Sequence, residues 1–200
     1  MLKDKQVVVI DTETTGLKYG YHEVIEFAGY IPSTGETLEL KLKPRHIERA
    51  DSIALKINGY NERDWSKAIE PEKGFITINE FLIDKIIVGH NIFFDYTHLK
   101  MSLDNYNISS KMSRRCVDTY TLAYEHLVPL GLESLSLESI CNFLGFSNKG
   151  AHAALIDVFR TYEVYKYLLR VSPQKLLLLK AKLSLKKKKD SFLQKFTPKL

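Results

Sequence analysis

The chain has 200 residues, of which 44% are hydrophobic and 26% are charged, so it has the size of one globular domain with at most a short extension. Ten Gly and six Pro exclude a collagen-like or low-complexity chain. No apolar run approaches a membrane span and the N-terminus lacks the apolar segment of a signal peptide, so we expect a cytoplasmic protein with no membrane partner. Cys116 and Cys141 have no second pair nearby, which argues against a zinc site or a disulfide framework.

The net charge of +5 is concentrated at the C-terminus. Nine of the 29 basic residues and one of the 24 acidic residues lie in 174–200, a charge of +8, which leaves 20 and 23 for residues 1–173, a charge of −3. Pro173 is expected to end the body of the protein. The sequence therefore predicts a domain over residues 1–172 and a basic Leu- and Lys-rich helix and tail over residues 173–200.

The N-terminal part of the chain predicts three strands. Val7 to Ile10 form a continuous apolar run, which is typical of a strand buried on both faces, so we expect a strand over residues 6–11. A second strand is expected over residues 24–31, and strict alternation predicts a half-exposed third strand over residues 37–43, after a Pro-Ser-Thr-Gly turn. Three consecutive strands of this kind form an antiparallel meander.

From residue 50 onward, most of the apolar spacing is that of helices. The expected elements are short helices around residues 53–57 and 74–85, a strand over 86–90, a helix over 93–106, a short strand over 116–119, and helices over 133–144 and 151–169. Strands that first pair antiparallel and then alternate with helices predict an α/β domain with a mixed sheet flanked by helices.

The first candidate site is the D-T-E-T-T-G segment that starts at Asp11. Residues two apart in an extended chain project to the same face, so Asp11 and Glu13 place two carboxylates side by side. Such a pair requires a proton or a cation between the two charges, and oxygen ligands favour a hard ion such as Mg²⁺ or Mn²⁺. For this segment alone, a polar strand end followed by a turn is the more common interpretation.

Two further segments carry candidate acids. Residues 90–95, H-N-I-F-F-D, join the fourth expected strand to a helix, where an acid such as Asp95 is ordinary at a helix N-terminus. Residues 152–157, H-A-A-L-I-D, open the last long helix. Side chains five residues apart on a helix project about 140° away from each other. His152 must therefore lie in the loop before the helix or in its first turn if it is to meet Asp157.

Together, the three segments resemble the signature of the DEDD exonucleases. The resemblance is to the DEDDh subgroup, which contains the epsilon-type proofreading subunits of bacterial DNA polymerase III. The matching residues are D-x-E-T-T-G-L at 11–17, H-N-x-x-F-D at 90–95 and H-x-A-x-x-D at 152–157, in the family's order and approximate spacing. The resemblance covers residues 5 to about 170 and implies a ribonuclease H-like fold with a five-stranded mixed sheet. It also implies 3′-to-5′ hydrolysis of nucleic acid to nucleoside 5′-monophosphates.

The resemblance implies roles for individual residues. Asp11, Glu13 and Asp157 would hold the metal ion that carries the attacking water, and Asp11 would bridge to a second ion that Asp95 contacts through water. His152, with an ordinary pKa of about 6.5, would accept the proton of that water. The residues expected to bind the terminal nucleotide are Thr14, Leu17, Asn58 and Phe94.

The resemblance favours single-stranded 3′ ends of DNA as substrate, because the first motif is more similar to the proofreading branch than to the oligoribonuclease branch. The alternatives are an RNA-trimming 3′-to-5′ exoribonuclease and a catalytically idle scaffold that binds nucleic acid. A DNA polymerase subunit is a candidate protein partner. The Lys-rich tail has three interpretations. It is a solvated extension, a segment that binds the phosphates of nucleic acid, or a peptide that docks on a protein partner through Phe192, Leu193 and Phe196, which recur at helical spacing.

Overall fold

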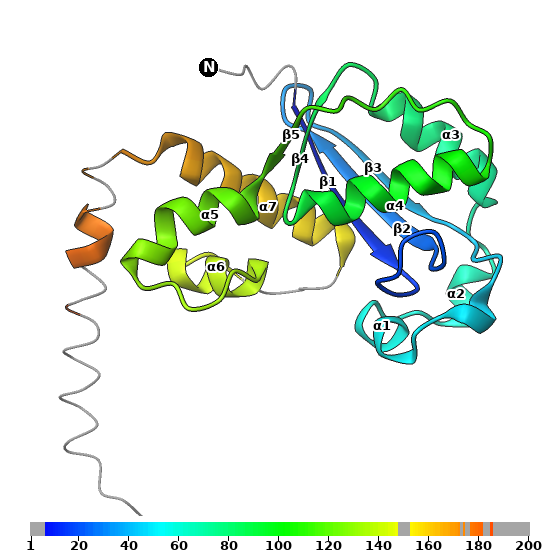
Figure 1. The fold of residues 1–200 in the computed structure, drawn as a ribbon, viewed down its shortest axis with the longest axis horizontal. Helices are drawn as coiled ribbons and strands as arrows, with labels where there is room; N and C mark the ends of the chain where they lie inside the picture. Colours follow the sequence, from blue (N-terminus) through cyan, green and yellow to red (C-terminus); the bar gives the residue numbers. More distant parts are fainter. Residues whose placement is uncertain (1–6, 148–152, 173, 175–176, 182–184, 186–200) are drawn as a thin grey trace, which may run out of the picture.

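The structure is a computed structural model that describes residues 7–147, 153–172, 174, 177–181 and 185. It contains a five-stranded sheet in the order β3-β2-β1-β4-β5 (Figure 1). The strands are β1 Val7–Thr14, β2 Val24–Ile31, β3 Glu36–Lys41, β4 Ile86–Gly89 and β5 Cys116–Asp118. β2 pairs antiparallel with both β1 and β3, whereas β4 pairs parallel with both β1 and β5. The predicted mixed sheet, a meander followed by parallel strands, is therefore confirmed.

Most of the expected helices are present. Within the described part of the chain, the α-helices are α1 Ser52–Ile57, α2 Glu62–Trp65, α3 Pro71–Phe81, α4 Ile92–Asn105, α5 Thr119–Leu127, α6 Leu137–Leu144 and α7 Ala154–Arg170. The ends of α3 and α6 differ from the predicted ends by up to four residues. Residues 177–181, in the segment expected to form a last helix, are helical. No described helix is both long and apolar enough to cross a lipid bilayer.

Helix α5 is absent from the sequence prediction. It begins with Thr119, Tyr120 and Thr121, residue types that favour strands over helices. Two features stabilise the helix in this context: the Asp118 side chain accepts a hydrogen bond from the Tyr120 N–H, and an apolar face packs into a core shared with α6 and α7. Tertiary packing therefore overrides local propensity here.

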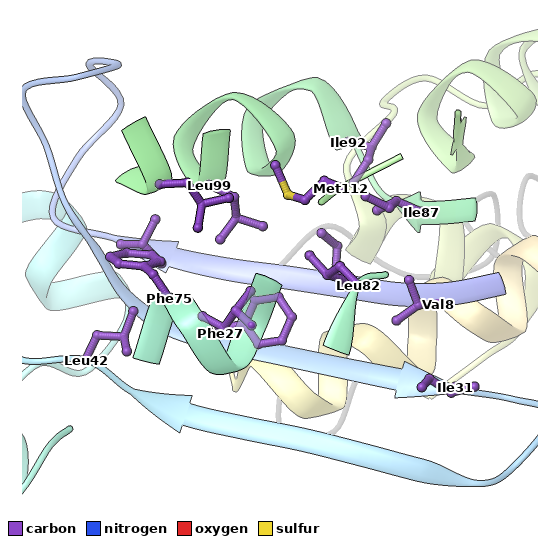
Figure 2. Packing of buried hydrophobic residues seen from close by; sticks show 14 residues of the cluster. Val8, Phe27, Ile31, Leu42, Phe75, Leu82, Ile87, Ile92, Leu99 and Met112 are labelled. Carbon is purple, nitrogen blue, oxygen red and sulfur yellow. The ribbon is translucent and has the colours of Figure 1, made fainter. Parts of the chain in front are cut away.

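Side chains of β1 alternate between two cores, one on each face of the sheet. Val8 and Ile10 belong to the core formed with α3 and α4, part of which Figure 2 shows. Val7 and Val9 belong to the core formed with α7. Burial on both faces explains the continuous apolar run at the start of β1. Because β1 lies in the middle of the sheet, its C-terminal half is within reach of helices from both layers (Figure 1).

Burial in the core of Figure 2 predicts which substitutions destabilise the fold. Leu99 of α4 is fully buried there, so Leu99→Ala is expected to lower the free energy of unfolding by about 2–5 kcal/mol, because it removes buried methyl groups and leaves a cavity. The matched control Leu17→Ala, at a side chain that is 77% exposed, is expected to change it by less than about 0.5 kcal/mol. Urea unfolding followed by circular dichroism measures both values, and equal losses would contradict this assignment.

Candidate active site

β1 extends three residues beyond its predicted end, so Glu13 lies within the strand and not in the following turn. Asp11 and Glu13 occupy the face of the sheet that α7 covers, because they continue the alternation of the residues in that core. Glu13 lies directly opposite Glu26 of β2. Side chains at directly opposite positions share a face, so this part of the sheet holds three carboxylates beside the start of α7.

Glu26 is a residue that the sequence analysis missed. It is only 8% exposed, and its carboxylate accepts a hydrogen bond from the N–H of Ala154, the first residue of α7. Burial raises the pKa of Glu26, and the neighbouring Lys41 lowers it. Glu26 thereby fixes the start of α7 and, three residues later, the position of Asp157. The signal in the sequence was an acid inside the apolar run V-I-E-F-A, since such residues are seldom buried without a partner.

Asp95 approaches β1 from the opposite layer. It is buried in the first turn of α4, and its Oδ1 accepts hydrogen bonds from the Thr12 N–H at 2.9 Å and the Thr12 Oγ1 at 2.7 Å. The ladder between β1 and β4 ends at the Val9–Val88 pair, which leaves the Thr12 N–H available to the helix. Burial raises the pKa of Asp95 to about 7, although the hydrogen bonds from Thr12 lower it.

The end of β5 fixes the start of α4. Asn91 precedes the helix with a left-handed φ of 59°, and its N–H donates to Asp118 Oδ1 at 2.8 Å. The ring nitrogens of His90 lie 3.0 Å from Thr119 Oγ1 and 2.9 Å from the Leu135 carbonyl oxygen. Burial lowers the pKa of His90. The first two residues of the H-N-x-x-F-D motif therefore position the helix that carries the acid.

Asp157 lies in the first turn of α7 and is paired with Arg160, one turn further along. Arg160 Nη1 donates to Asp157 Oδ1 at 2.7 Å, and the side chains of Arg160 and Asp157 are only 7% and 13% exposed. An arginine buried to this extent requires a carboxylate partner. The sequence analysis passed over Arg160, although a separation of three residues from Asp157 is a contact distance on a helix. His152, the predicted proton acceptor, lies outside the described residues.

The four predicted acids, Asp11, Glu13, Asp95 and Asp157, interact electrostatically and are called the acidic cluster below. Burial raises the pKa of Asp11 well above its usual range, and the charges of Asp95, Glu13 and Asp157 raise it further. Burial raises the pKa of Glu13 to about 7, with additional contributions from Glu26 and two cluster members. Among the described residues, no three His, Cys, Asp or Glu side chains are arranged as ligands of one ion. The cluster is therefore crowded but is not assembled as a closed set of metal ligands.

Two of the residues predicted to bind substrate lie beneath the surface. Thr14 is buried, and its Oγ1 donates to the Gly16 carbonyl oxygen at 2.7 Å. Asn58 is also buried; its Nδ2 donates to the Thr14 carbonyl oxygen at 3.0 Å and its Oδ1 accepts from the Tyr60 N–H at 3.2 Å. These side chains support the end of β1 from within the protein, and contact of either one with substrate stays a prediction.

The other two predicted substrate contacts, Leu17 and Phe94, are more accessible. Leu17 lies on the loop between β1 and β2, and Phe94 is half-buried with its ring centroid 4.5 Å from that of His98. Tyr19 of the same loop also packs on His98, at 4.9 Å, and so anchors the loop to α4. The neighbouring Phe93, which the sequence analysis did not select, is 68% exposed. Substrate contact by Leu17 and Phe94 stays a prediction.

The part of the chain that carries the acidic cluster matches the model of a known protein family. The exonuclease family model, RNase_T, matches residues 8–165, which include all four acids. The chain belongs to the exonuclease family. Its fold is the ribonuclease H-like fold, and the domain is a 3′-to-5′ exonuclease of the DEDD type, as the sequence resemblance implied.

Relatives of this exonuclease domain include much longer proteins. The PolC-type DNA polymerase III of Thermotoga maritima is 32% identical over 166 residues, which cover 81% of this chain and 12% of that protein. The PolC-type enzyme of Mycoplasma pneumoniae is 30% identical over 181 residues, 83% of this chain and again 12% of the relative. The chain thus spans only 12% of the length of these two relatives.

Two solved structures share the fold of this exonuclease domain. Escherichia coli exonuclease I in complex with a dT13 oligonucleotide has a TM-score of 0.69 at 20% identity, covering 86% of this chain and 42% of that chain. Exonuclease I of Methylocaldum szegediense has a TM-score of 0.70 at 24% identity, covering 85% of this chain and 41% of that chain.

The raised pKa of Glu13 predicts how the stability of the metal-free domain varies with pH. Folding raises this pKa from 4.5 to about 7, so the folded state binds more protons across that interval and loses stability as the pH rises through it. Glu13→Gln removes this contribution and is expected to reduce the loss between pH 5 and pH 8 by about 2–3 kcal/mol. Urea unfolding in the presence of a chelator measures the free energy of unfolding of both proteins.

Comparison with wild type is essential to this experiment, because buried histidines change the free energy of unfolding with pH in the opposite direction. Burial lowers the pKa of His98 to about 4, so its contribution to stability is lost as the pH falls below about 6.5. The difference between Glu13→Gln and wild type isolates the carboxylate. An identical pH dependence of the two proteins would contradict the buried, crowded environment of Glu13.

Proposed function

We propose that the domain removes nucleotides from single-stranded 3′ ends of DNA as nucleoside 5′-monophosphates, with two divalent ions, Mg²⁺ or Mn²⁺, as cofactors. The observation that carries the proposal is the acidic cluster, in which burial and the surrounding carboxylates raise the pKa of Asp11. Such crowding is relieved either by protons or by a bound cation. All four donors are carboxylates, and oxygen donors suit a hard divalent ion.

In this proposal the cluster members have distinct roles. Asp11, Glu13 and Asp157 would hold one ion, and Asp11 and Asp95 would hold the second. When bound, the two ions activate a water molecule and offset the charge that develops at the scissile phosphate. His152 would accept the proton of the attacking water, since an imidazole with a near-neutral pKa suits that task.

The choice of substrate is supported by the comparisons. The relatives of the domain are named as PolC-type DNA polymerases, and Escherichia coli exonuclease I has been solved with dT13 and dA16 oligonucleotides. Similarity to a polymerase also supports a proofreading role beside a DNA polymerase. RNA trimming is the alternative activity, because the acidic cluster acts on the phosphodiester and not on the sugar that distinguishes the two polymers.

The central test is the substitution Asp11→Asn. It is expected to lower turnover of an end-labelled DNA single strand in Mg²⁺ by about a thousandfold or more, equivalent to about 4 kcal/mol of transition-state stabilisation. The matched control Asp64→Asn, at an exposed acid of α2, should retain turnover. Chromatography identifies the products, which should be nucleoside 5′-monophosphates. Undiminished hydrolysis in Asp11→Asn, or in wild type with excess EDTA, would contradict the mechanism.

The same assay separates the alternatives when the substrate is changed. Faster loss of a matched RNA strand would replace DNA by RNA as the substrate. Faster removal of a mispaired than of a paired 3′ terminus would support proofreading, whereas equal rates would argue against it. If no strand is hydrolysed in either Mg²⁺ or Mn²⁺, the idle scaffold becomes the better interpretation.

We also propose that the Lys-rich tail contacts phosphates. Replacing Lys186, Lys187, Lys188 and Lys189 by Gln is expected to reduce the slope of log affinity against log salt by up to about 3, since each phosphate contact on a single strand contributes about 0.7. Turnover at saturating substrate should stay the same, because the tail is not part of the acidic cluster. Fluorescence anisotropy of a labelled oligonucleotide across a salt series measures the slope. An unchanged slope would contradict phosphate contact and leave the solvated extension and the docking peptide as interpretations.

A further inference from the structure

A groove lies between helix α4 and strand β5, the strand at one edge of the sheet. Figure 1 shows where these two elements lie. The groove encloses about 540 Å³ and is lined by Ile92, Phe93, Tyr96, Lys100, Arg114 and Cys116. Pockets of about 300–1,000 Å³ accommodate small organic molecules, so the groove has room for a nucleotide-sized group. We propose that this α4–β5 groove binds the part of the single strand that precedes the 3′-terminal nucleotide, an inference that rests on the proposed function.

The groove begins at the first turn of α4, the turn that also carries Asp95. Phe93 precedes Asp95 by two residues, so the two side chains project to nearly opposite sides of the helix. Phe93, Tyr96 and Lys100 follow one another at separations of three and four residues, which places them in a row along one side of the helix. The groove therefore runs along α4 from the turn that carries Asp95. A strand whose end lies at the acidic cluster would pass around the start of α4 to enter it.

The lining combines aromatic rings with cations. Phe93 is 68% exposed, and Tyr96 lies one helical turn away in the same groove. Every base has a face that stacks on an aromatic ring, so such contacts are independent of sequence. Aromatic stacking together with positive charge along the backbone is the combination that proteins use to bind single strands.

The exposed Arg114 favours a polyanion over an apolar peptide as the occupant of the groove. Arg114 is exposed and forms no ion pair within the described residues, whereas Lys100 is paired with Asp104. Positive charge continues beyond the groove into a neighbouring hollow of about 230 Å³, whose charged lining residues are Asp84, Lys85, Lys111 and Arg115. Phosphates that leave the groove would therefore meet further cations near the starts of β4 and β5.

Cys116 allows the groove to be tested directly. It is exposed and lines the groove, whereas the other cysteine, Cys141, is fully buried. The experiment measures the rate at which a thiol reagent modifies Cys116 in the full-length Asp11→Asn protein with Mg²⁺, in the presence of a dT8 oligonucleotide or of thymidine 5′-monophosphate. Saturating dT8 is expected to slow the modification at least about fivefold, while the mononucleotide should change it less than about twofold, because it reaches only the terminal site.

Anisotropy measured in the same samples establishes that dT8 is bound. Saturated binding with unchanged modification of Cys116 would overturn the inference and leave the groove as a candidate site for an apolar segment of a protein. Hydrolysis by wild type is a separate measurement, so failure of the groove and failure of the proposed function are distinguishable.

A substitution gives a second, kinetic test. In the otherwise wild-type protein, Arg114→Gln is expected to raise the KM for an octamer about three- to tenfold. The KM for a dinucleotide should stay unchanged, because only the longer strand reaches the groove. Arg170→Gln, at the exposed end of α7, is the matched control. An equal effect of Arg114→Gln on both substrates would overturn the inference, since it would indicate a general structural change.

Discussion

The structure of the site depends on the burial of carboxylates against one another on the central strand of the sheet. Asp11 points to the face that α7 covers, where burial raises its pKa and the charges of Glu13 and Asp157 raise it further. Beyond Val9, no β4 residue pairs with β1, so α4 can bring Asp95 to the open edge of the same strand. The same geometry that crowds the acids makes their cluster a place for positive charge.

Hydrogen bonds from neighbouring elements hold the acids in this unfavourable arrangement. Thr12 donates its N–H and its hydroxyl to Asp95, and the first N–H of α7 donates to Glu26. These donors are neutral and orient the carboxylates. Two cations also lie close to them, Lys41 next to Glu26 and Arg160 next to Asp157. Packing on both faces of β1 offsets the electrostatic repulsion that remains between the carboxylates. This is expected where a fold holds functional groups in fixed positions.

The parts of the molecule that follow from hydrophobic pattern were predictable from the sequence. The buried run at the start of β1, the order of the five strands along the chain and the helices on either side all depend on local spacing. Helix α5 did not follow, because its strand-forming residues are made helical by packing against α6 and α7. The four acids were found through motif order, but Glu26 and Arg160 belong to no motif. Their roles depend on cross-strand register and helix packing, which a single sequence does not display.

The distribution of charge bears on how an acidic site can act on a polyanion. Residues 1–173 have a net charge of −3, so the body of the protein as a whole does not attract phosphates. Local cations must do so, and Lys85, Arg114 and Arg115 lie near the starts of β4 and β5. The acidic cluster adjoins the opposite ends of the parallel strands, where α4 begins, and the α4–β5 groove lies between the two regions. A strand bound along this line would keep its internal phosphates on cations and present only its end to the acids.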